Sequence, residues 1–211
     1  MRRTVSKFPT KQTEVQISGE LSLRITEAVD AYELLNGMIE KETRMQRTER
    51  FPYWAELWPA AVGLSRWLCE HAAEYRFRSA VELGCGLGLV AVTLSRLGWR
   101  VRATDFVEDA LVFTAHNGNA NRAASNLSVA YLDWSSPVGQ PTDLLVASDV
   151  AYDLKNHPYL NRVLRALLKA GGQLILSDPR RPAARSFIAL LEEGGYEHTQ
   201  DRSEEHTSEL Q

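Results

Sequence analysis

A glycine-rich segment between a short apolar run and an apolar helical stretch constrains the fold of this chain more than any other feature. It reads V-E-L-G-C-G-L-G over residues 81–88, with a glycine at every second position from Gly84. Such glycines let the backbone turn tightly and approach a ligand, and the amides beyond them open onto a helix N-terminus. Asp105 follows about 20 residues later, where an acidic side chain can bind a ribose diol. Together these features predict a strand, a loop and a helix that hold a nucleoside-containing cofactor.

From residue 79 onward, short apolar runs alternate with amphipathic stretches. This alternation indicates parallel strands joined by right-handed crossover helices. We therefore predict an α/β fold, a doubly wound, Rossmann-like sheet in a three-layer α/β/α arrangement, with ligands at the carboxyl ends of the strands. A glycine pair, Gly171-Gly172, is expected to end the third of the helices. The expected strands cover 80–84, 100–104, 127–132, 143–148 and 172–177, and the expected helices cover 88–97, 107–117, 158–169 and 182–193.

The chain divides into three parts. Residues 1–50 predict an N-terminal extension with two short strands, at 13–17 and 21–26, and a helix from Asp30 to about Glu40. Residues 51–201 carry all the motifs and predict one domain. Residues 202–211 resemble the translation of a common DNA sequencing adapter, so we treat them as an artefact and exclude them from the fold prediction. On this interpretation the natural chain continues beyond residue 201, and the domain is expected to lack its last strands.

Composition argues against several classes of function. The chain has 211 residues and a net charge of −3, which does not indicate nucleic-acid binding through a broad basic surface. No apolar run approaches the roughly 18 residues of a membrane span, and the basic N-terminus lacks the apolar stretch of a secretory signal. Cys69 and Cys85 are too few for a disulfide framework and lack metal-ligand spacing. We expect a cytoplasmic monomer without metal, membrane or nucleic-acid partners.

Acidic and aromatic residues follow the later strands of the predicted sheet. Asp133 and Trp134 follow the third strand, where an acid and a ring suit adenine; a solvent-facing acid and a packed ring are the alternative. Ser148 and Asp149 end the fourth strand, and Tyr152 comes three residues later. A capping acid followed by a packed tyrosine is the alternative here. The carboxyl end of a parallel strand, where ligands bind, favours a site.

An aromatic segment, P-Y-W-A-E-L-W-P-A-A, precedes the predicted sheet at residues 52–61. Core packing is the expectation for Trp54. Trp58 stands beside Pro59 at the predicted start of a helix. A ring in that position forms a rigid wall that suits a cofactor.

These motifs, in this order, resemble the class I S-adenosylmethionine-dependent methyltransferases, and among them the protein-lysine methyltransferases of methyltransferase family 16. The resemblance covers residues 50–200. It is most specific in the D-x-x-Y formed by Asp149 and Tyr152 and in the W-P helix start at Trp58. The run S-D-P-R-R-P at 177–182 resembles the branch that methylates the electron-transfer flavoprotein β subunit.

The resemblance implies a class I methyltransferase fold and S-adenosyl-L-methionine as the cofactor. It implies that Asp149 and Tyr152 line the channel of the substrate amine, and we expect these two as the catalytic residues. The implied reaction is N-methylation of a lysine in a protein substrate. The residues expected to bind the cofactor are Trp58, Gly84, Cys85, Gly86, Asp105, Trp134 and Ser148.

Three other functions stay open at this point. The chain could methylate a small amine, or it could be a noncatalytic module that binds S-adenosylmethionine. A nicotinamide-dependent oxidoreductase is disfavoured, because Leu89 stands where the dinucleotide fingerprint has its third glycine or alanine. The sequence does not identify the substrate protein, the residue or the number of methyl groups.

Other candidate residues have ordinary explanations. The thiol of Cys85 lies inside the loop, where the amide matters more than the sulfur. Glu82 is expected to orient the same loop. His157 has no partner at triad or metal spacing, so a capping or surface role is expected. Arg180 and Arg181 are expected to be exposed and solvated.

Overall fold

A parallel sheet forms the centre of the computed structural model, which describes residues 4–29, 52–76 and 78–201. The helix expected at Asp30–Glu40 and residues 202–211 lie outside these ranges. The order of the strands is β5-β4-β3-β6-β7, and all neighbours run parallel. The strands are β3 (Ser79–Leu83), β4 (Arg100–Asp105), β5 (Leu127–Tyr131), β6 (Thr142–Ser148) and β7 (Leu168–Ser177).

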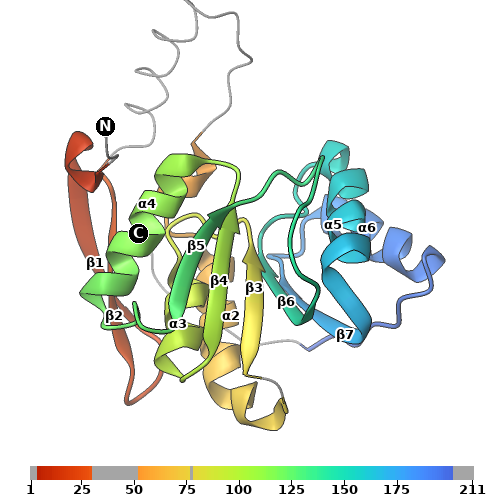
Figure 1. Ribbon diagram of the computed structural model, residues 1–211, viewed down its shortest axis with the longest axis horizontal. Coiled ribbons are helices and arrows are strands. Elements are labelled where there is room, and N and C mark those ends of the chain that lie inside the picture. The colour runs from red at the N-terminus through yellow and green to blue at the C-terminus, as the bar shows by residue number, and fades with distance from the viewer. Residues whose placement is uncertain (1–3, 30–51, 77, 202–211) are drawn as a thin grey trace, which may run out of the picture.

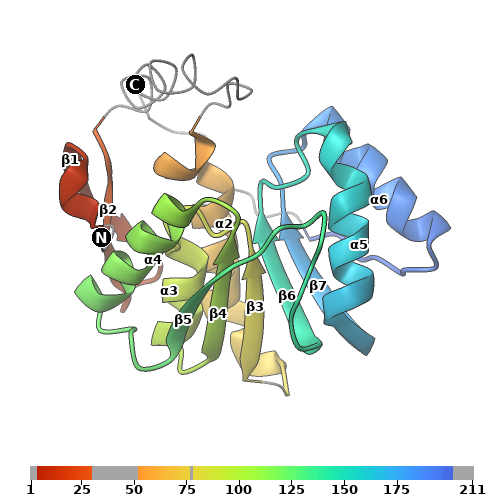
Figure 2. The same ribbon diagram turned by 45° about the horizontal axis from the view of Figure 1, so that its top comes forward.

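Helices cover both faces of this sheet, which confirms the predicted doubly wound, three-layer arrangement (Figures 1 and 2). On one face lie α2 (Pro59–His71), α3 (Leu89–Arg96) and α4 (Glu108–Ala120). On the other lie α5 (His157–Leu167) and α6 (Pro182–Glu193). Among the described residues, no helix combines the length and apolar character needed to cross a membrane.

The interior strand β6 shows why two layers of helices are needed. Leu144 and Val146 pack into the cluster under α2 and α3, whereas Leu145 and Ala147 pack into the cluster under α5 and α6. Successive side chains of a strand point to opposite faces, so a continuous apolar run must be covered on both sides.

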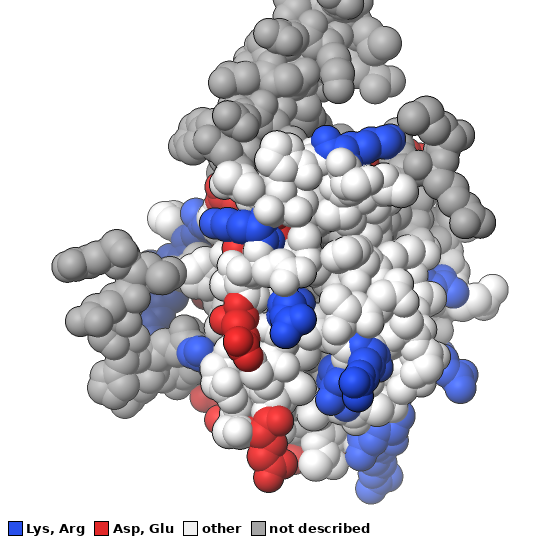
Figure 3. All heavy atoms as spheres, turned by 90° about the vertical axis from the view of Figure 1, so that its left-hand side faces the viewer, with Lys and Arg blue, Asp and Glu red and all other residues white. Residues whose placement is uncertain are grey.

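A separate antiparallel hairpin, β1 (Thr10–Gln16) and β2 (Ser22–Ala28), packs against α4 at the edge of the molecule. These two strands are the pair expected near 13–17 and 21–26. Figure 3 views the hairpin side and shows basic and acidic side chains interspersed with neutral atoms. The buried members of this contact include Leu23 and Ile25 of β2 and Phe113 of α4.

The predicted end of the third helix is wrong. Helix α5 ends at Leu167, and Leu168 already pairs with Thr142 as the first residue of β7. The next pair joins Leu144 to Gln173, so the register shifts between them. The glycine pair lies inside this irregular part of the strand, and Gly171 has a φ of 74° there. Gly171 and Gly172 therefore lie in an irregular part of the strand and not at a helix cap.

Beyond α6, the described chain turns back toward α2. No strand occurs among the described residues 195–201. The indole Nε1 of Trp67, on α2, donates to Oδ2 of Asp201 at 2.7 Å. Residues at opposite ends of the described domain are thereby in contact.

Candidate active site

The glycine-rich loop joins the carboxyl end of β3 to α3, as the motif predicts. Gly84, Gly86 and Gly88 all have positive φ, at 66°, 52° and 81°. A Cβ at Gly88 would lie 2.6 Å from Cγ2 of Thr114, and one at Gly84 would lie 3.0 Å from Cγ1 of Val150. Glycine is thus required by the backbone conformation and by close neighbours at the same time.

Two buried acidic side chains, Glu82 and Asp105, stabilise the conformation of this loop and of the helix after it. Oε2 of Glu82 accepts from the amide of Ala91 in the first turn of α3 at 3.0 Å. Asp105 accepts from the amides of Gly86 at 3.0 Å and Val107 at 2.9 Å. Burial raises the pKa of Glu82 to about 8 and also raises the pKa of Asp105. Glu82 thus orients the loop, as expected, through the N-terminus of the helix.

Asp105 keeps room for a further ligand. Its carboxylate accepts from the backbone amides of Val107, Gly86 and Phe106, and an ionised carboxylate offers about four acceptor positions. The side chain stands at the carboxyl end of β4, beside the glycine loop. The remaining acceptor capacity suits a hydroxyl group of a ribose. The contact with ribose stays a prediction.

Cys85 is engaged within the protein through both its amide and its sulfur. Its amide donates to the carbonyl of Thr104 at 2.9 Å, and its sulfur lies 3.3 Å from Oγ1 of Thr114. Burial raises the pKa of the thiol well above its usual range, which makes the sulfur a poor nucleophile. A direct contact between this amide and a cofactor would require the bond to Thr104 to break.

Trp134 lies against the glycine loop. Its Cζ2 is 3.4 Å from the position that a Cβ at Gly84 would take, and the ring is partly buried beside Leu132 and Val150. Asp133 is exposed and accepts from the amide of Ser135 at 2.8 Å. Hydrogen bonds from Ser135 lower the pKa of Asp133. The contact of Trp134 with adenine stays a prediction that this position allows. The carboxylate of Asp133 instead stabilises the turn at Ser135.

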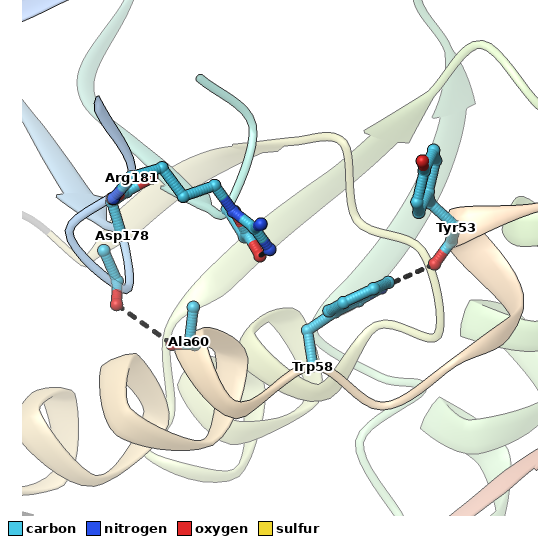
Figure 4. Close-up of polar contacts among 7 residues, drawn as sticks. Tyr53, Trp58, Ala60, Asp178 and Arg181 are labelled. Atoms are coloured by element: carbon cyan, nitrogen blue, oxygen red, sulfur yellow. Dashed lines mark hydrogen bonds and ion pairs between the residues drawn. The ribbon is translucent and has the colours of Figure 1, made fainter. Parts of the chain in front are cut away.

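Trp58 belongs to a row of aromatic rings at the start of α2. Its Nε1 donates to the carbonyl oxygen of Tyr53 at 2.7 Å (Figure 4). The ring of Tyr53 lies 5.8 Å from the ring of Trp58 and 5.3 Å from that of Tyr152, between centroids. Sequence reasoning missed Tyr53, although it stands inside the aromatic segment. Trp54 packs on Phe113 in the core, as expected.

Asp149 follows β6 directly and is the most constrained acid of the site. Its φ is 49°, its side chain is 6% exposed, and its amide donates to the carbonyl of Ser177 at 2.8 Å. Arg181 donates from Nε to Oδ1 at 2.8 Å and from Nη2 to Oδ2 at 2.7 Å. Arg181 is thus bound to Asp149 while its side chain stays 40% exposed, so the expectation of an exposed arginine holds only in part. Its neighbour Arg180 is exposed, as expected.

His157 is also placed differently from the expectation of a surface or purely capping role. The side chain is buried at the start of α5, and its Nε2 lies 3.0 Å from the carbonyl oxygen of Ala151. Its ring packs on Phe187 at 5.2 Å between centroids. His157 therefore fixes the backbone between Asp149 and Tyr152.

The order of the strands brings the expected site residues together. Because β3 and β6 are hydrogen-bonded neighbours, with Leu83 opposite Ala147, Ser148 stands beside the start of the glycine loop. Ser148 is paired with Ser177 at the end of β7. Ser177 in turn donates to the carbonyl oxygen of Ala60 at 3.0 Å. The loops after β3, β6 and β7 and the start of α2 thus meet at one edge of the sheet.

Comparison with known sequences agrees with this geometry. Residues 40–194 match the family described as lysine methyltransferase. The chain belongs to the lysine methyltransferase family. The resemblance proposed from the motifs is thereby confirmed, and so is the assignment to the class I methyltransferases.

Several relatives of this member of the lysine methyltransferase family are named as lysine methyltransferases. Protein N-lysine methyltransferase METTL21A of Mus musculus is 38% identical over 146 residues, covering 65% of this chain and 66% of that protein. EEF1A lysine methyltransferase 3 of Xenopus tropicalis is 29% identical over 131 residues, covering 60% and 58%. Electron transfer flavoprotein beta subunit lysine methyltransferase of Danio rerio is 30% identical over 135 residues, covering 62% and 51%. The matches span about half to two thirds of the length of these curated relatives.

A solved structure shares the fold. The crystal structure of precorrin 8w decarboxylase from Methanobacterium thermoautotrophicum matches with a TM-score of 0.51 and 20% identity. The match covers 64% of this chain and 72% of that one. At this identity the likeness concerns the architecture alone.

Proposed function

We propose that this chain uses S-adenosyl-L-methionine to methylate the ε-amine of a lysine in a protein substrate. The observation that carries the proposal is the contact between its two motifs. Val150, inside the D-x-x-Y segment, lies against Gly84 of the cofactor loop. A donor held at the loop and an amine held at Asp149 and Tyr152 would therefore be neighbours. The names of the relatives support lysine as the acceptor.

The residues around the glycine loop fit S-adenosylmethionine. Asp105 retains acceptor capacity for a ribose hydroxyl, and Trp134 offers a partly buried ring beside Gly84. Trp58 offers a second ring on the side of α2. When bound, the cofactor supplies an activated methyl group on a sulfonium. The chain itself must then hold the acceptor nitrogen in line, at about 3–3.5 Å from that methyl group.

The acceptor side must favour a neutral amine. A free lysine has a pKa of about 10.4, and an environment with low polarity lowers it. Tyr53 and Tyr152 provide an aromatic surface at this place. Asp149 already accepts two hydrogen bonds from the guanidinium of Arg181, which fix the orientation of its carboxylate. We therefore propose that Asp149 orients the amine by hydrogen bonding, while the released proton goes to solvent.

The first test is calorimetric titration of S-adenosylhomocysteine into the chain, with NADH as the control. We expect micromolar binding of the first ligand alone. The second test adds methyl-labelled S-adenosylmethionine and a heat-treated cell extract, followed by acid hydrolysis of the labelled proteins. Label in methylated lysines supports the proposal. Binding of NADH alone, or label confined to small molecules, contradicts it.

We further propose that residues 51–201 form the catalytic domain and that the protein is a cytoplasmic monomer. The two cysteines support a reducing compartment, because Cys69 and Cys85 are both unpaired. Light scattering coupled to size-exclusion chromatography tests the oligomeric state. Fluorescence microscopy of a tagged chain in its own cells tests the location.

A further inference from the structure

The bidentate ion pair between Arg181 and Asp149 joins two loops of the site. Asp149 follows β6, and Arg181 lies in the loop between β7 and α6. The two hydrogen bonds, at 2.8 and 2.7 Å, run from Nε and Nη2 to separate carboxylate oxygens. This fork-to-fork arrangement fixes direction as well as distance, and lysine cannot reproduce it.

Asp149 needs such a partner for two reasons. Its carboxylate is almost fully buried, and removing the counter-ion of a buried charge strongly destabilises the folded protein. Its backbone is left-handed, with a φ of 49°, a conformation that a residue other than glycine keeps only when its surroundings impose it. The hydrogen bond from the Asp149 amide to the carbonyl oxygen of Ser177 holds this conformation through the backbone. The ion pair with Arg181 holds it through the side chain.

Arg181 is itself held in place. Its amide donates to Oδ1 of Asp178 at 2.7 Å, at the end of β7. Among the described residues, Oδ2 of Asp178 is buried and has no hydrogen-bond partner. Asp178 thus holds the backbone of Arg181 while Asp149 binds its guanidinium, and the pKa of Asp178 is raised, mainly by burial and also by the charge of Asp149. The adjacent Arg180 faces solvent.

We propose that Arg181 is a positioning residue of the acceptor site. It holds the carboxylate of Asp149 in the one orientation that can receive the substrate amine. The inference rests on the proposed function, because it concerns the same site. It adds a residue from the loop after β7 to a site whose predicted catalytic residues, Asp149 and Tyr152, follow β6.

The first experiment needs no acceptor. Spectra of the 15N-labelled full chain are recorded with S-adenosylhomocysteine for the wild type, Arg181→Gln and the control Arg180→Gln. We expect Arg181→Gln to shift the amide signals of Asp149, Val150 and Tyr152, and Arg180→Gln to leave them in place. We expect Asp149→Asn to remove the solvent protection of the Arg181 Nε–H signal. Unchanged amide signals in Arg181→Gln would overturn the proposal.

The second experiment measures methyl transfer to the proteins of the heat-treated extract. We expect Arg181→Gln to lose about 10²-fold in rate, the order that a misplacement of ~1 Å costs. Its affinity for S-adenosylhomocysteine should stay within about threefold, because the pair lies on the acceptor side. Arg181→Lys, which keeps the charge but not the fork, should lose about tenfold or more. Full activity in Arg181→Lys would refute a positioning role.

Added guanidinium separates positioning from simple destabilisation. Millimolar guanidinium chloride should restore part of the activity of Arg181→Ala and none of that of Asp149→Ala. A wild-type chain that binds S-adenosylhomocysteine but labels no protein would contradict the proposed function instead. The amide signals of Arg181→Gln would still decide whether Arg181 orients Asp149.

Discussion

The side chain of Asn117 exchanges two hydrogen bonds with the backbone of Thr26, as a neighbouring strand would. Its Oδ1 accepts from the Thr26 amide at 2.8 Å, and its Nδ2 donates to the Thr26 carbonyl oxygen at 3.1 Å. The same Nδ2 donates to the carbonyl oxygen of Leu87 at 2.9 Å. One turn later, Asn121 makes the corresponding pair with Arg24. The side chain of Asn117, on α4, therefore binds both the N-terminal hairpin and the glycine loop.

Replacing Asn117 with Ala should destabilise the protein by about 2–4 kcal/mol, because each buried polar group left without a partner costs about 1–3 kcal/mol. Affinity for S-adenosylhomocysteine should fall as well, since the carbonyl of Leu87 loses its partner. Urea denaturation and calorimetry measure the two effects. Asn119→Ala is the control, because Asn119 is exposed and its side chain donates to the carbonyl oxygen of Ala115 in the same helix. Equal losses in both variants would contradict the role of Asn117.

Glu82 should make stability depend on pH. Its pKa is raised from 4.5 to about 8, so the folded state holds a proton that the unfolded state releases between these values. The free energy of unfolding should therefore fall as pH rises from about 5 to 8, by up to about 1.4 kcal/mol per pH unit. Glu82→Gln keeps an acceptor for the Ala91 amide but cannot ionise. The difference between the two proteins in urea titrations at several pH values isolates the contribution, and parallel curves would disprove it.

Asp105→Ala should weaken binding of S-adenosylhomocysteine by about tenfold or more, since charge-assisted hydrogen bonds contribute about 1.5–3 kcal/mol each. The loss has two sources: the ribose contact and the Gly86 amide that the carboxylate holds. Calorimetry gives the affinity. Asp143→Ala serves as the control, because its exposed pair with Lys169 lies at the other end of the sheet. Unchanged affinity in Asp105→Ala would exclude the ribose contact.

Asp149→Asn should remove methyl transfer to protein while sparing the cofactor. We expect a loss of about 10²-fold or more, because an amide cannot accept both bonds of the guanidinium and the carboxylate's orientation is lost. Label transfer from S-adenosylmethionine measures the rate, and calorimetry checks that S-adenosylhomocysteine still binds. Asp153→Asn is the matched control, since Asp153 is a nearby acid whose side chain accepts from the amide of Lys155 at 2.9 Å. Activity that survives Asp149→Asn would rule out its role.

The sequence predicted the parallel sheet and the edge that carries the site, because both follow from local patterns. Glycines at 84, 86 and 88 specify left-handed backbone, and the continuous apolar run of β6 specifies a strand covered on both faces. The boundary at Gly171 was mistaken because strand pairing with β6, a nonlocal interaction, begins at Leu168 and overrides the cap signal.

The side-chain partnerships of the site could not be predicted in the same way. Arg181 stands 32 residues from Asp149, and Tyr53 reaches Tyr152 from a segment before the sheet begins. Nothing in the local composition distinguishes Arg181 from Arg180, since only the path of the loop after β7 decides which one turns inward. His157 is similar, because its burial depends on Phe187 of α6.

The pairing of β3 with β6 has a consequence for how a protein of this kind can change its target. The donor side is built by the segments after β3, β4 and β5 together with Trp58, whereas the acceptor side is built by the segments after β6 and β7 together with Tyr53. The two halves touch mainly at one seam, where Leu83 faces Ala147 and Gly84 meets Val150. New loops after β6 and β7 could therefore admit a different polypeptide while the chemistry of the donor half stayed as it was.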